Sequence, residues 1–294
     1  MAFDLPTRLD TRPLAVIGAG TLGRRIALML SLQGAEVRVH ARTAATREAA
    51  VGWAKEQQPQ LLDKVAGSRA GGIVAVDDLA AAVDDAWLVV ESVPEDLVLK
   101  QAVFRQLDAL APADAILATN SSSLSSSALV TSVANPARLL NIHFLMPPAV
   151  VPVELMSCGQ TDAAVIELLV QRLPAYGLSP YVVQAESMGF IFNRIWAAIK
   201  RETLLVLAEG VTTPQALDAL YREATGQRMG PCQLMDSVGL DVVLAIEEHY
   251  ASARPALPEA PRKLLRAMVA DGRLGHKSGR GFYDYSGPNG ANRP

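Results

Sequence analysis

Length, composition and charge exclude several classes of protein before any motif is considered. The chain has 294 residues, 50% of them hydrophobic and 19% charged, with 27 Lys and Arg against 30 Asp and Glu. At roughly 150 residues per domain, this length predicts about two domains, whose cores need no disulfide or metal to hold them together. The net charge of −3 argues against a nucleic-acid-binding protein. No apolar run reaches the roughly 18 residues of a membrane-spanning helix, so we expect no membrane segment.

The cysteines and histidines form no recognisable site. Cys158 and Cys232 belong to no motif, and Met1–Asp10 lacks the basic and apolar regions of a signal peptide, which favours a reducing, cytoplasmic compartment. No metal site is expected, because ligand spacing is absent around the 4 histidines, which are His40, His143, His249 and His276.

The first part of the chain alternates short apolar runs with segments of helical spacing. Helices are predicted at Thr21–Leu32, Thr43–Val65, Asp78–Val83 and Glu95–Leu110. The strands predicted around them are Leu14–Ile17, Glu36–His40, Ile73–Val76, Trp87–Val90 and Ala115–Ala118. Apolar strands that alternate with helices indicate a parallel sheet covered by helices.

The pattern changes along the second part of the chain. Two strands with little between them, Leu139–Phe144 and Val151–Met156, precede a predicted helix at Asp162–Tyr176 and a strand at Tyr181–Gln184. After Ser187 the strand signals stop, and the predicted helices are Phe190–Ala208, Pro214–Thr225, Cys232–Ala251 and Pro261–Val269. The predicted fold is α/β: a Rossmann-type, doubly wound, mainly parallel sheet over residues 1–187, with a smaller all-helical C-terminal domain over residues 188–294.

A glycine-rich loop joins the first predicted strand to the first predicted helix. Its sequence, Gly18-Ala19-Gly20-Thr21-Leu22-Gly23, is G-x-G-x-x-G in the context of a dinucleotide-binding turn. The first glycine allows a tight turn, the second lets a pyrophosphate approach, and the third lets helix and strand pack closely. The N–H groups at the helix N-terminus then face the phosphates. The alternative is an ordinary glycine turn. The expected cofactor contacts are Gly18, Gly20, Thr21, Leu22 and Gly23.

The end of the second predicted strand bears on which dinucleotide binds. NAD enzymes place an acidic residue there to bind the ribose 2′-OH. Here the strand is followed by Ala41, Arg42 and Thr43, without a carboxylate. Ala41 leaves room, Arg42 can pair with a 2′-phosphate, and Thr43 supplies a second donor. The sequence therefore favours NADP(H), with NAD(H) as the alternative if Arg42 is only a solvated surface arginine.

Polar residues at the ends of the later strands suggest a catalytic site. Ser122 follows a predicted parallel strand, at the edge where α/β sheets bind ligands. His143 and Glu154 lie in the two adjacent strands and face each other if the chain reverses between them. A carboxylate beside an imidazole favours the charged ring and orients it. Asn193, in the first helix of the second domain, can reach back towards them. A base and amide or hydroxyl donors suit hydride transfer at a carbon that bears a hydroxyl.

Simpler interpretations exist for two of these residues. A single histidine in an apolar strand is often a satisfied core residue, and the serines around Ser122 can cap a helix. Glu154 is harder to explain in this way, because an unpaired buried carboxylate is costly.

The motifs together resemble those of the short-chain-length 3-hydroxyacyl-CoA dehydrogenases, including 3-hydroxybutyryl-CoA dehydrogenases, over nearly the whole chain. Besides the glycine loop, the matching segments are Val89–Leu97, Thr119–Leu124, Asn141–Phe144, Val153–Leu155, Gly189–Arg194, Gly230–Asp236 with Gly239–Asp241, and Leu274–Tyr283.

The resemblance implies roles for individual residues. His143 is implied as the general acid–base, with Glu154 as its partner. Ser122 and Asn193 are implied to hold the substrate oxygen and the cofactor face, and Glu95 and Lys100 to lie along the nicotinamide ribose. Lys277, in the last motif, completes the expected cofactor contacts. The resemblance also implies a homodimer formed through the helical domain.

The sequence departs from the family where the substrate is expected. The segment Thr43–Gly72 is shorter than the family's helical hairpin that contacts CoA, and the segment between His143 and Glu154 is one residue shorter. The expected substrate is therefore a small-molecule hydroxy- or oxo-acid derivative, either a CoA thioester or a smaller acid. Two alternatives stay open: an enzyme of the β-hydroxyacid dehydrogenase type acting on a free hydroxy acid, and a non-catalytic cofactor-binding protein.

Overall fold

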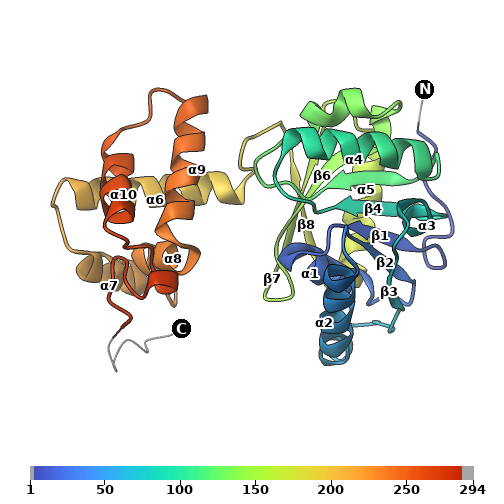
Figure 1. Cartoon of the computed structure of the whole chain (residues 1–294), viewed down its shortest axis with the longest axis horizontal. Coiled ribbons are helices and arrows are strands. Elements are labelled where there is room, and N and C mark those ends of the chain that lie inside the picture. Colours follow the sequence, from blue (N-terminus) through green and yellow to red (C-terminus); the bar gives the residue numbers. More distant parts are fainter. Residues whose placement is uncertain (1–2, 287–294) are drawn as a thin grey trace. The chain divides into compact units, whose positions relative to one another are not determined.

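The computed structural model describes residues 3–286, which form two compact units. The first unit ends at Ile191 and the second begins at Phe192 (Figure 1). Among the described residues, no helix combines the length and the apolar character needed to cross a membrane.

An eight-stranded sheet forms the centre of the first unit, with the order β3-β2-β1-β4-β5-β6-β7-β8. Strands β1 to β6 run parallel, β7 is antiparallel to β6, and β8 runs parallel to β7. The predicted mainly parallel sheet is confirmed. The bounds of the strands are β1 Leu14–Ile17, β2 Val37–His40, β3 Ile73–Ala75, β4 Leu88–Glu91, β5 Ile116–Thr119, β6 Leu139–Met146, β7 Val150–Ser157 and β8 Ser179–Val183.

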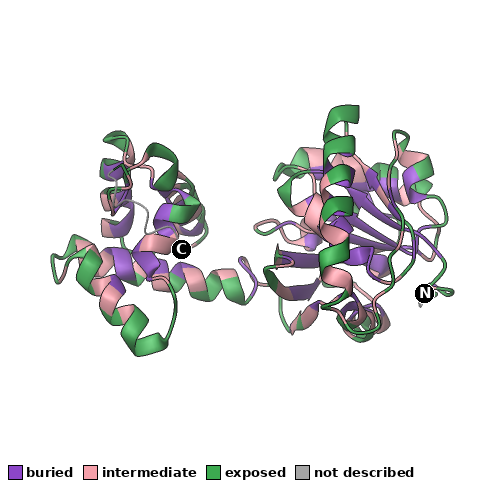
Figure 2. Cartoon of the chain, turned by 90° about the horizontal axis from the view of Figure 1, so that it is seen from below, coloured by how far each residue is buried: buried purple, intermediate pink, exposed green. Residues whose placement is uncertain are grey.

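Helices cover both faces of this sheet. The strands are buried (Figure 2). Alternate side chains enter two cores: Val16 and Val90 pack on one side and Ala15 and Val89 on the other. The first core includes side chains of α1 (Thr21–Leu30), α2 (Ala44–Leu62) and α5 (Ala163–Arg172), and the second those of α3 (Leu79–Val83), α4 (Leu97–Leu110) and the 3₁₀ helix η1 (Ser126–Ser132). The doubly wound arrangement is therefore confirmed.

Two details of this unit differ from the sequence-based expectation. The helix predicted at Asp162–Tyr176 is α-helical only as far as Arg172, and a 3₁₀ turn, η3 (Leu173–Tyr176), carries Pro174. A proline inside a helix cannot donate the hydrogen bond that continues the α-helical pattern. The sequence pattern also gave no sign of η1 within the serine-rich segment or of the short 3₁₀ helix η2 (Pro136–Arg138).

The second unit is built from helices around its own apolar core, which includes Leu204, Met235, Val243 and Leu265. The helices are α6 Phe192–Ala208, α7 Pro214–Thr225, α8 Pro231–Val238, α9 Leu240–Ala253, α10 Ala260–Ala270 and η4 His276–Ser278.

One predicted helix of this second unit was wrong. The segment Cys232–Ala251 forms parts of two helices, α8 and α9, rather than one. Gly239 separates them with a φ of +105°, which no helical residue adopts and which favours glycine.

Candidate active site

The glycine-rich loop has the geometry of a phosphate cradle. Gly18 has a φ of +111°, and a Cβ on it would lie 2.3 Å from the carbonyl oxygen of Ser92. A Cβ on Gly23 would lie 1.8 Å from the Gly18 carbonyl oxygen, whereas one on Gly20 would meet no atom within 4 Å. Gly20 is also the N-cap of α1 and has no side chain with which to cap its first N–H groups. The loop therefore has no room for a side chain at Gly18 or Gly23, whereas the space beside Gly20 is open, as a bound pyrophosphate requires.

The residues after β2 present an exposed cation and no carboxylate. Arg42 is exposed, and neither a hydrogen bond nor an ion pair is recorded for it within the described part of the chain. Thr43 is engaged locally, because its hydroxyl caps α2 by accepting a hydrogen bond from the N–H of Thr46, at 3.3 Å. Of the three predicted residues, Arg42 therefore has the most freely available donors.

A buried network closes the carboxyl ends of β4 and β5. Glu91 and Lys100 are 0% and 1% exposed, and the Lys100 ammonium donates to both Glu91 carboxylate oxygens at 2.8 and 3.1 Å. Glu91 also accepts from the Thr119 hydroxyl and the Val93 N–H, both at 2.6 Å. Lys100 further donates to the Val93 carbonyl and lies 3.4 Å from Glu95. Because an ammonium has three donors, those of Lys100 are taken up within the protein.

Glu95 connects this network to the serine-rich loop. One of its oxygens accepts from the hydroxyl of Ser121, from the hydroxyl and N–H of Ser123 at 2.6 and 3.0 Å, and from the N–H of Leu124 at 3.3 Å. Burial alone raises the pKa of Glu95, but the bonds from Ser121 and Ser123 and the Lys100 charge together lower it below its ordinary value. Glu95 and Lys100 therefore hold the loop that presents Ser122.

The two strands β6 and β7 bring His143 and Glu154 together. They are direct partners in the antiparallel register, and His143 Nδ1 lies 2.8 Å from Glu154 Oε2. His143 is 4% and Glu154 3% exposed. Since Nδ1 faces the carboxylate, Nε2 is the ring nitrogen left for a ligand. The predicted pairing of these two residues across a chain reversal is confirmed.

Three residues without a predicted catalytic role support this pair. Phe190 stacks on the His143 ring, with centroids 4.6 Å apart and planes 19° apart, although its φ of +54° is rare for a side chain of this size. The N–H of Ile191 donates to Glu154 Oε1 at 2.8 Å. Asn120 accepts from the Phe144 N–H at 2.9 Å. Phe190 and Ile191 lie in the Gly189–Arg194 motif, which was the available signal.

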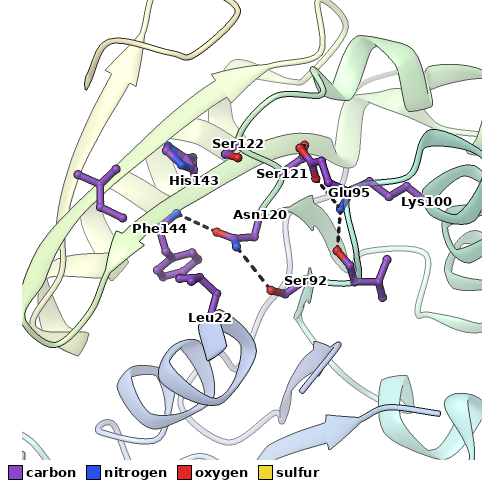
Figure 3. Close-up of a pocket in the computed structure, with 11 residues that line it drawn as sticks. Leu22, Ser92, Glu95, Lys100, Asn120, Ser121, Ser122, His143 and Phe144 are labelled. Atoms are coloured by element: carbon purple, nitrogen blue, oxygen red, sulfur yellow. Dashed lines mark hydrogen bonds and ion pairs between the residues drawn. The ribbon is translucent and has the colours of Figure 1, made fainter. Parts of the chain in front are cut away.

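A pocket of about 290 Å³ lies at the carboxyl edge of the sheet, and His143, Asn120 and Glu95 are among the side chains that line it (Figure 3). Ser122 is exposed and lies beside His143 in this view. The pocket lies directly beside α1 and the glycine loop, because Leu22 is part of its wall. Its other lining residues are Ser92, Val93, Glu95, Lys100, Asn120, Ser121, Ser122, His143, Phe144 and Leu145.

Asn193 and Lys277 belong to the second unit. Asn193 lies in the first turn of α6. Lys277 lies in η4, half-exposed, and forms an ion pair with Asp241. Among the described residues, no group of three or more His, Cys, Asp or Glu side chains is placed to hold a metal ion.

Comparisons with known proteins cover both units. Residues 13–186 match the family described as 3-hydroxyacyl-CoA dehydrogenase, NAD binding domain, and residues 189–285 match the C-terminal domain of the same family. A probable 3-hydroxybutyryl-CoA dehydrogenase of Deinococcus radiodurans is 33% identical over 276 residues, covering 92% of this chain and 99% of that protein.

Two further relatives carry names without CoA. A solved diketoreductase, described for dual catalysis of dicarbonyl compounds, has a TM-score of 0.81 and 30% identity, and the match covers 94% of this chain and 99% of that one. The 5-formyl-3-hydroxy-2-methylpyridine 4-carboxylate 5-dehydrogenase of Mesorhizobium japonicum is 28% identical, over 94% of this chain and 91% of that protein. With both domains matched in order, the chain belongs to the 3-hydroxyacyl-CoA dehydrogenase family, whose enzymes are oxidoreductases that act on CH–OH groups.

Proposed function

We propose that this protein interconverts a 3-hydroxyacyl and a 3-oxoacyl group by hydride transfer, with His143 as the general acid–base. The observation that supports this proposal most strongly is the His143–Glu154 pair, joined at 2.8 Å, in which His143 lines the pocket beside the glycine loop. In the alcohol-oxidising direction, His143 Nε2 takes the hydroxyl proton, and in the reducing direction it returns that proton to the carbonyl oxygen. Glu154 holds the ring through Nδ1 and stabilises its charged form.

The remaining predicted residues bind and orient in this proposal. Ser122 donates to the reacting oxygen as negative charge develops on it. Asn193 is proposed as a second donor from the helical domain (residues 188–294), and Lys277 as a cofactor contact. The glycine loop would hold the pyrophosphate, with Thr21 and Leu22 supplying N–H groups at the start of α1. Glu95 and Lys100 would border the nicotinamide ribose. The nicotinamide ring, when bound, supplies or accepts the hydride.

Replacing His143 tests the assignment directly. For His143→Gln, we expect turnover of an accepted 3-oxoacyl substrate to fall by about 10²-fold or more, because the proton carrier is removed. Cofactor binding, followed by fluorescence of the bound reduced cofactor, should stay unchanged. The matched control is His249→Gln, at an exposed histidine of α9. Near-normal turnover of the His143 variant would show that another group carries the proton, and cofactor binding without turnover of any substrate by the unaltered protein would favour the non-catalytic alternative.

We further propose that the cofactor is NADP(H) rather than NAD(H). The support is the absence of a carboxylate after β2 together with the exposed, available guanidinium of Arg42. Arg42→Ala should lower the ratio of kcat/KM for NADPH over NADH by about tenfold or more, whereas Arg105→Ala on α4 should leave it unchanged. A preference of the unaltered protein for NADH would contradict this proposal.

We propose that the second unit also forms a homodimer interface. Several large apolar side chains of this unit are exposed and would be available to a second copy of the chain. Leu220→Glu should therefore shift a dimer towards monomer in light scattering, and a protein that is monomeric throughout would contradict the proposal. These exposed side chains are Ile195, Val211, Leu220, Val238 and Val242. Cys158 and Cys232 are both free thiols, in keeping with the cytoplasmic location that we propose.

A further inference from the structure

Two neighbouring arginines of α1 share one tryptophan of α2. Arg24 and Arg25 come directly after Gly23, the last glycine of the loop. Their guanidinium carbons lie 4.6 and 5.3 Å from the centre of the Trp53 ring. Arg25 also donates to the carbonyl oxygen of Pro147 at 2.9 Å. Two cationic groups are thus gathered against one aromatic wall beside the tip of the β6–β7 hairpin.

Protein groups leave these two charges uncompensated. Among the described residues, no carboxylate oxygen lies within ion-pair distance of either guanidinium, and the Nε atoms of both are buried without a hydrogen-bond partner. Arg24 and Arg25 are half-buried. The fully buried arginines Arg12, Arg47 and Arg138 of the same unit differ, since each pairs with an aspartate.

The position of the two arginines on α1 also disfavours their positive charges. Arg24 and Arg25 follow the first turn of α1, near the positive end of the helix dipole, where a cation is disfavoured. Like charges near this helix end are best explained by an anion that is bound during function.

The location of the two arginines relative to the His143–Glu154 pair indicates which ligand carries this anion. Pro147 lies at the turn between β6 and β7, the strands that carry His143 and Glu154. The four residues of chain from His143 to Pro147 span roughly 13 Å when extended. A ligand with its reacting carbon at His143 can therefore place a second group, on the order of 10 Å away, against the arginines. The pyrophosphate of the cofactor, by contrast, has its own cradle at Gly18–Gly23.

We propose that Arg24, Arg25 and Trp53 form a subsite that binds a phosphate or carboxylate group at the distal end of the substrate. Guanidinium groups suit both anions because they donate two parallel hydrogen bonds. Trp53 holds the two side chains together and provides an apolar surface for the chain that leads to the anion. The inference rests on the proposed function, since it names the end of the substrate that does not react.

The kinetic test uses 3-oxoacyl thioesters with and without an anion far from the reacting carbonyl. Acetoacetyl-CoA carries phosphates, the N-acetylcysteamine thioester of 3-oxodecanedioate carries a carboxylate at the far end of its chain, and the N-acetylcysteamine thioester of acetoacetate is uncharged. For Arg24→Gln/Arg25→Gln, we expect the KM of at least one anionic substrate to rise by about tenfold or more, with kcat within about twofold. The KM of the uncharged thioester should not change. The control, Lys55→Gln/Arg105→Gln, removes the same charge from exposed positions of α2 and α4.

The outcomes separate the two possible anions. A rise for acetoacetyl-CoA alone identifies a phosphate, and a rise for the 3-oxodecanedioate thioester alone identifies a carboxylate; either result supports the subsite. An equal rise for the uncharged thioester, the same change in the control variant, or no change at all would overturn it. A weaker affinity for NADPH with unchanged substrate KM would also overturn it, because the anion would then belong to the cofactor.

A binding measurement does not depend on turnover. Calorimetry with CoA, adipate and inorganic phosphate should show that the unaltered protein binds at least one of them, and that the double variant binds it about tenfold more weakly. Binding without turnover of any substrate would contradict the proposed function and still support the subsite. If the unaltered protein binds none of the three, or the variant binds equally well, the subsite is wrong even for an active enzyme.

Discussion

Two buried acid–base pairs each include a carboxylate from the same sheet and use their charges differently. Glu91 at the end of β4 pairs with Lys100, and Glu154 in β7 pairs with His143, each at 2.8 Å. Both carboxylates are almost fully buried. In the first pair, the Lys100 ammonium is engaged by Glu91, Val93 and Glu95. In the second, the ring keeps Nε2 for the pocket.

The difference shows that burial and pairing alone do not identify a catalytic group. An ammonium whose three donors are all engaged can position a loop and border a bound ligand, but it has no proton to exchange with one. An imidazole has two nitrogens, so one can be held by a carboxylate while the other exchanges a proton. We therefore expect the Glu91–Lys100 pair to contribute mainly to stability and the Glu154–His143 pair mainly to turnover.

The largest expected effect is on stability at Glu91. Glu91→Gln leaves the Lys100 charge buried with a weaker partner, so urea denaturation should show a loss of about 3 kcal/mol in the free energy of unfolding. The double variant Glu91→Gln/Lys100→Met should be less destabilised than the sum of its single variants, because the unpaired charge is then absent. Additive effects, or a greater loss of turnover than at Glu154, would remove the distinction between the two pairs.

At Glu154 we expect the opposite result: a large loss of turnover and a small loss of stability. Glu154→Gln keeps the size of the side chain but removes the carboxylate that faces Nδ1 of His143 and orients its ring. We expect kcat to fall by about 10²-fold, with a smaller loss of stability than at Glu91. Steady-state kinetics and urea denaturation on the same preparations measure both quantities. An active but unstable Glu154 variant would contradict this assignment.

Phe190 distinguishes the two pairs, because its ring stacks on His143 of the second pair. Phe190→Leu removes the stacked ring while keeping an apolar side chain, so kcat should fall by about three- to tenfold, with KM nearly unchanged. Phe104→Leu, in the core beneath α4, is the matched control: it loses the same ring volume from a buried site and should leave kcat unchanged. Equal effects of the two variants on kcat would mean that the stack has no special role.

The smallest expected effect is at Glu95, which joins the Lys100 network to the serine loop. Hydrogen bonds lower the pKa of Glu95 in the folded state, so its stabilising effect is present above its ordinary pKa and is lost as pH falls through the lowered value. Because Glu95 is partly exposed, Glu95→Gln should cost less than about 1 kcal/mol at pH 7. The gap to the unaltered protein should narrow as the pH falls below the ordinary pKa of the carboxyl group and close below the lowered pKa of Glu95. A gap that widens in acid would show that the charge of Glu95 is unfavourable; Glu56→Gln is the exposed control.

Much of the architecture was predictable because it depends on local patterns. The alternating apolar strands, the glycine loop and the helical second half were all evident in the sequence. The break between α8 and α9 was not, because Gly239 acts there through a left-handed backbone angle that a helical pattern does not reveal. The facing of His143 and Glu154 was a conditional prediction, since it depended on a reversal that only strand pairing could establish.

Motifs and periodicity are local properties, and they were enough to assign the family, the mainly parallel sheet and the set of polar residues at its carboxyl edge. Which of these residues are free to act depends on how the chain packs. The tertiary structure showed that the Lys100 donors are consumed by Glu91 and its neighbours, that Phe190 covers His143, and that Arg24 and Arg25 meet at Trp53 without a carboxylate partner among the described residues. Such facts depend on contacts between distant segments, and these form only when the sheet orders its strands and helices in space.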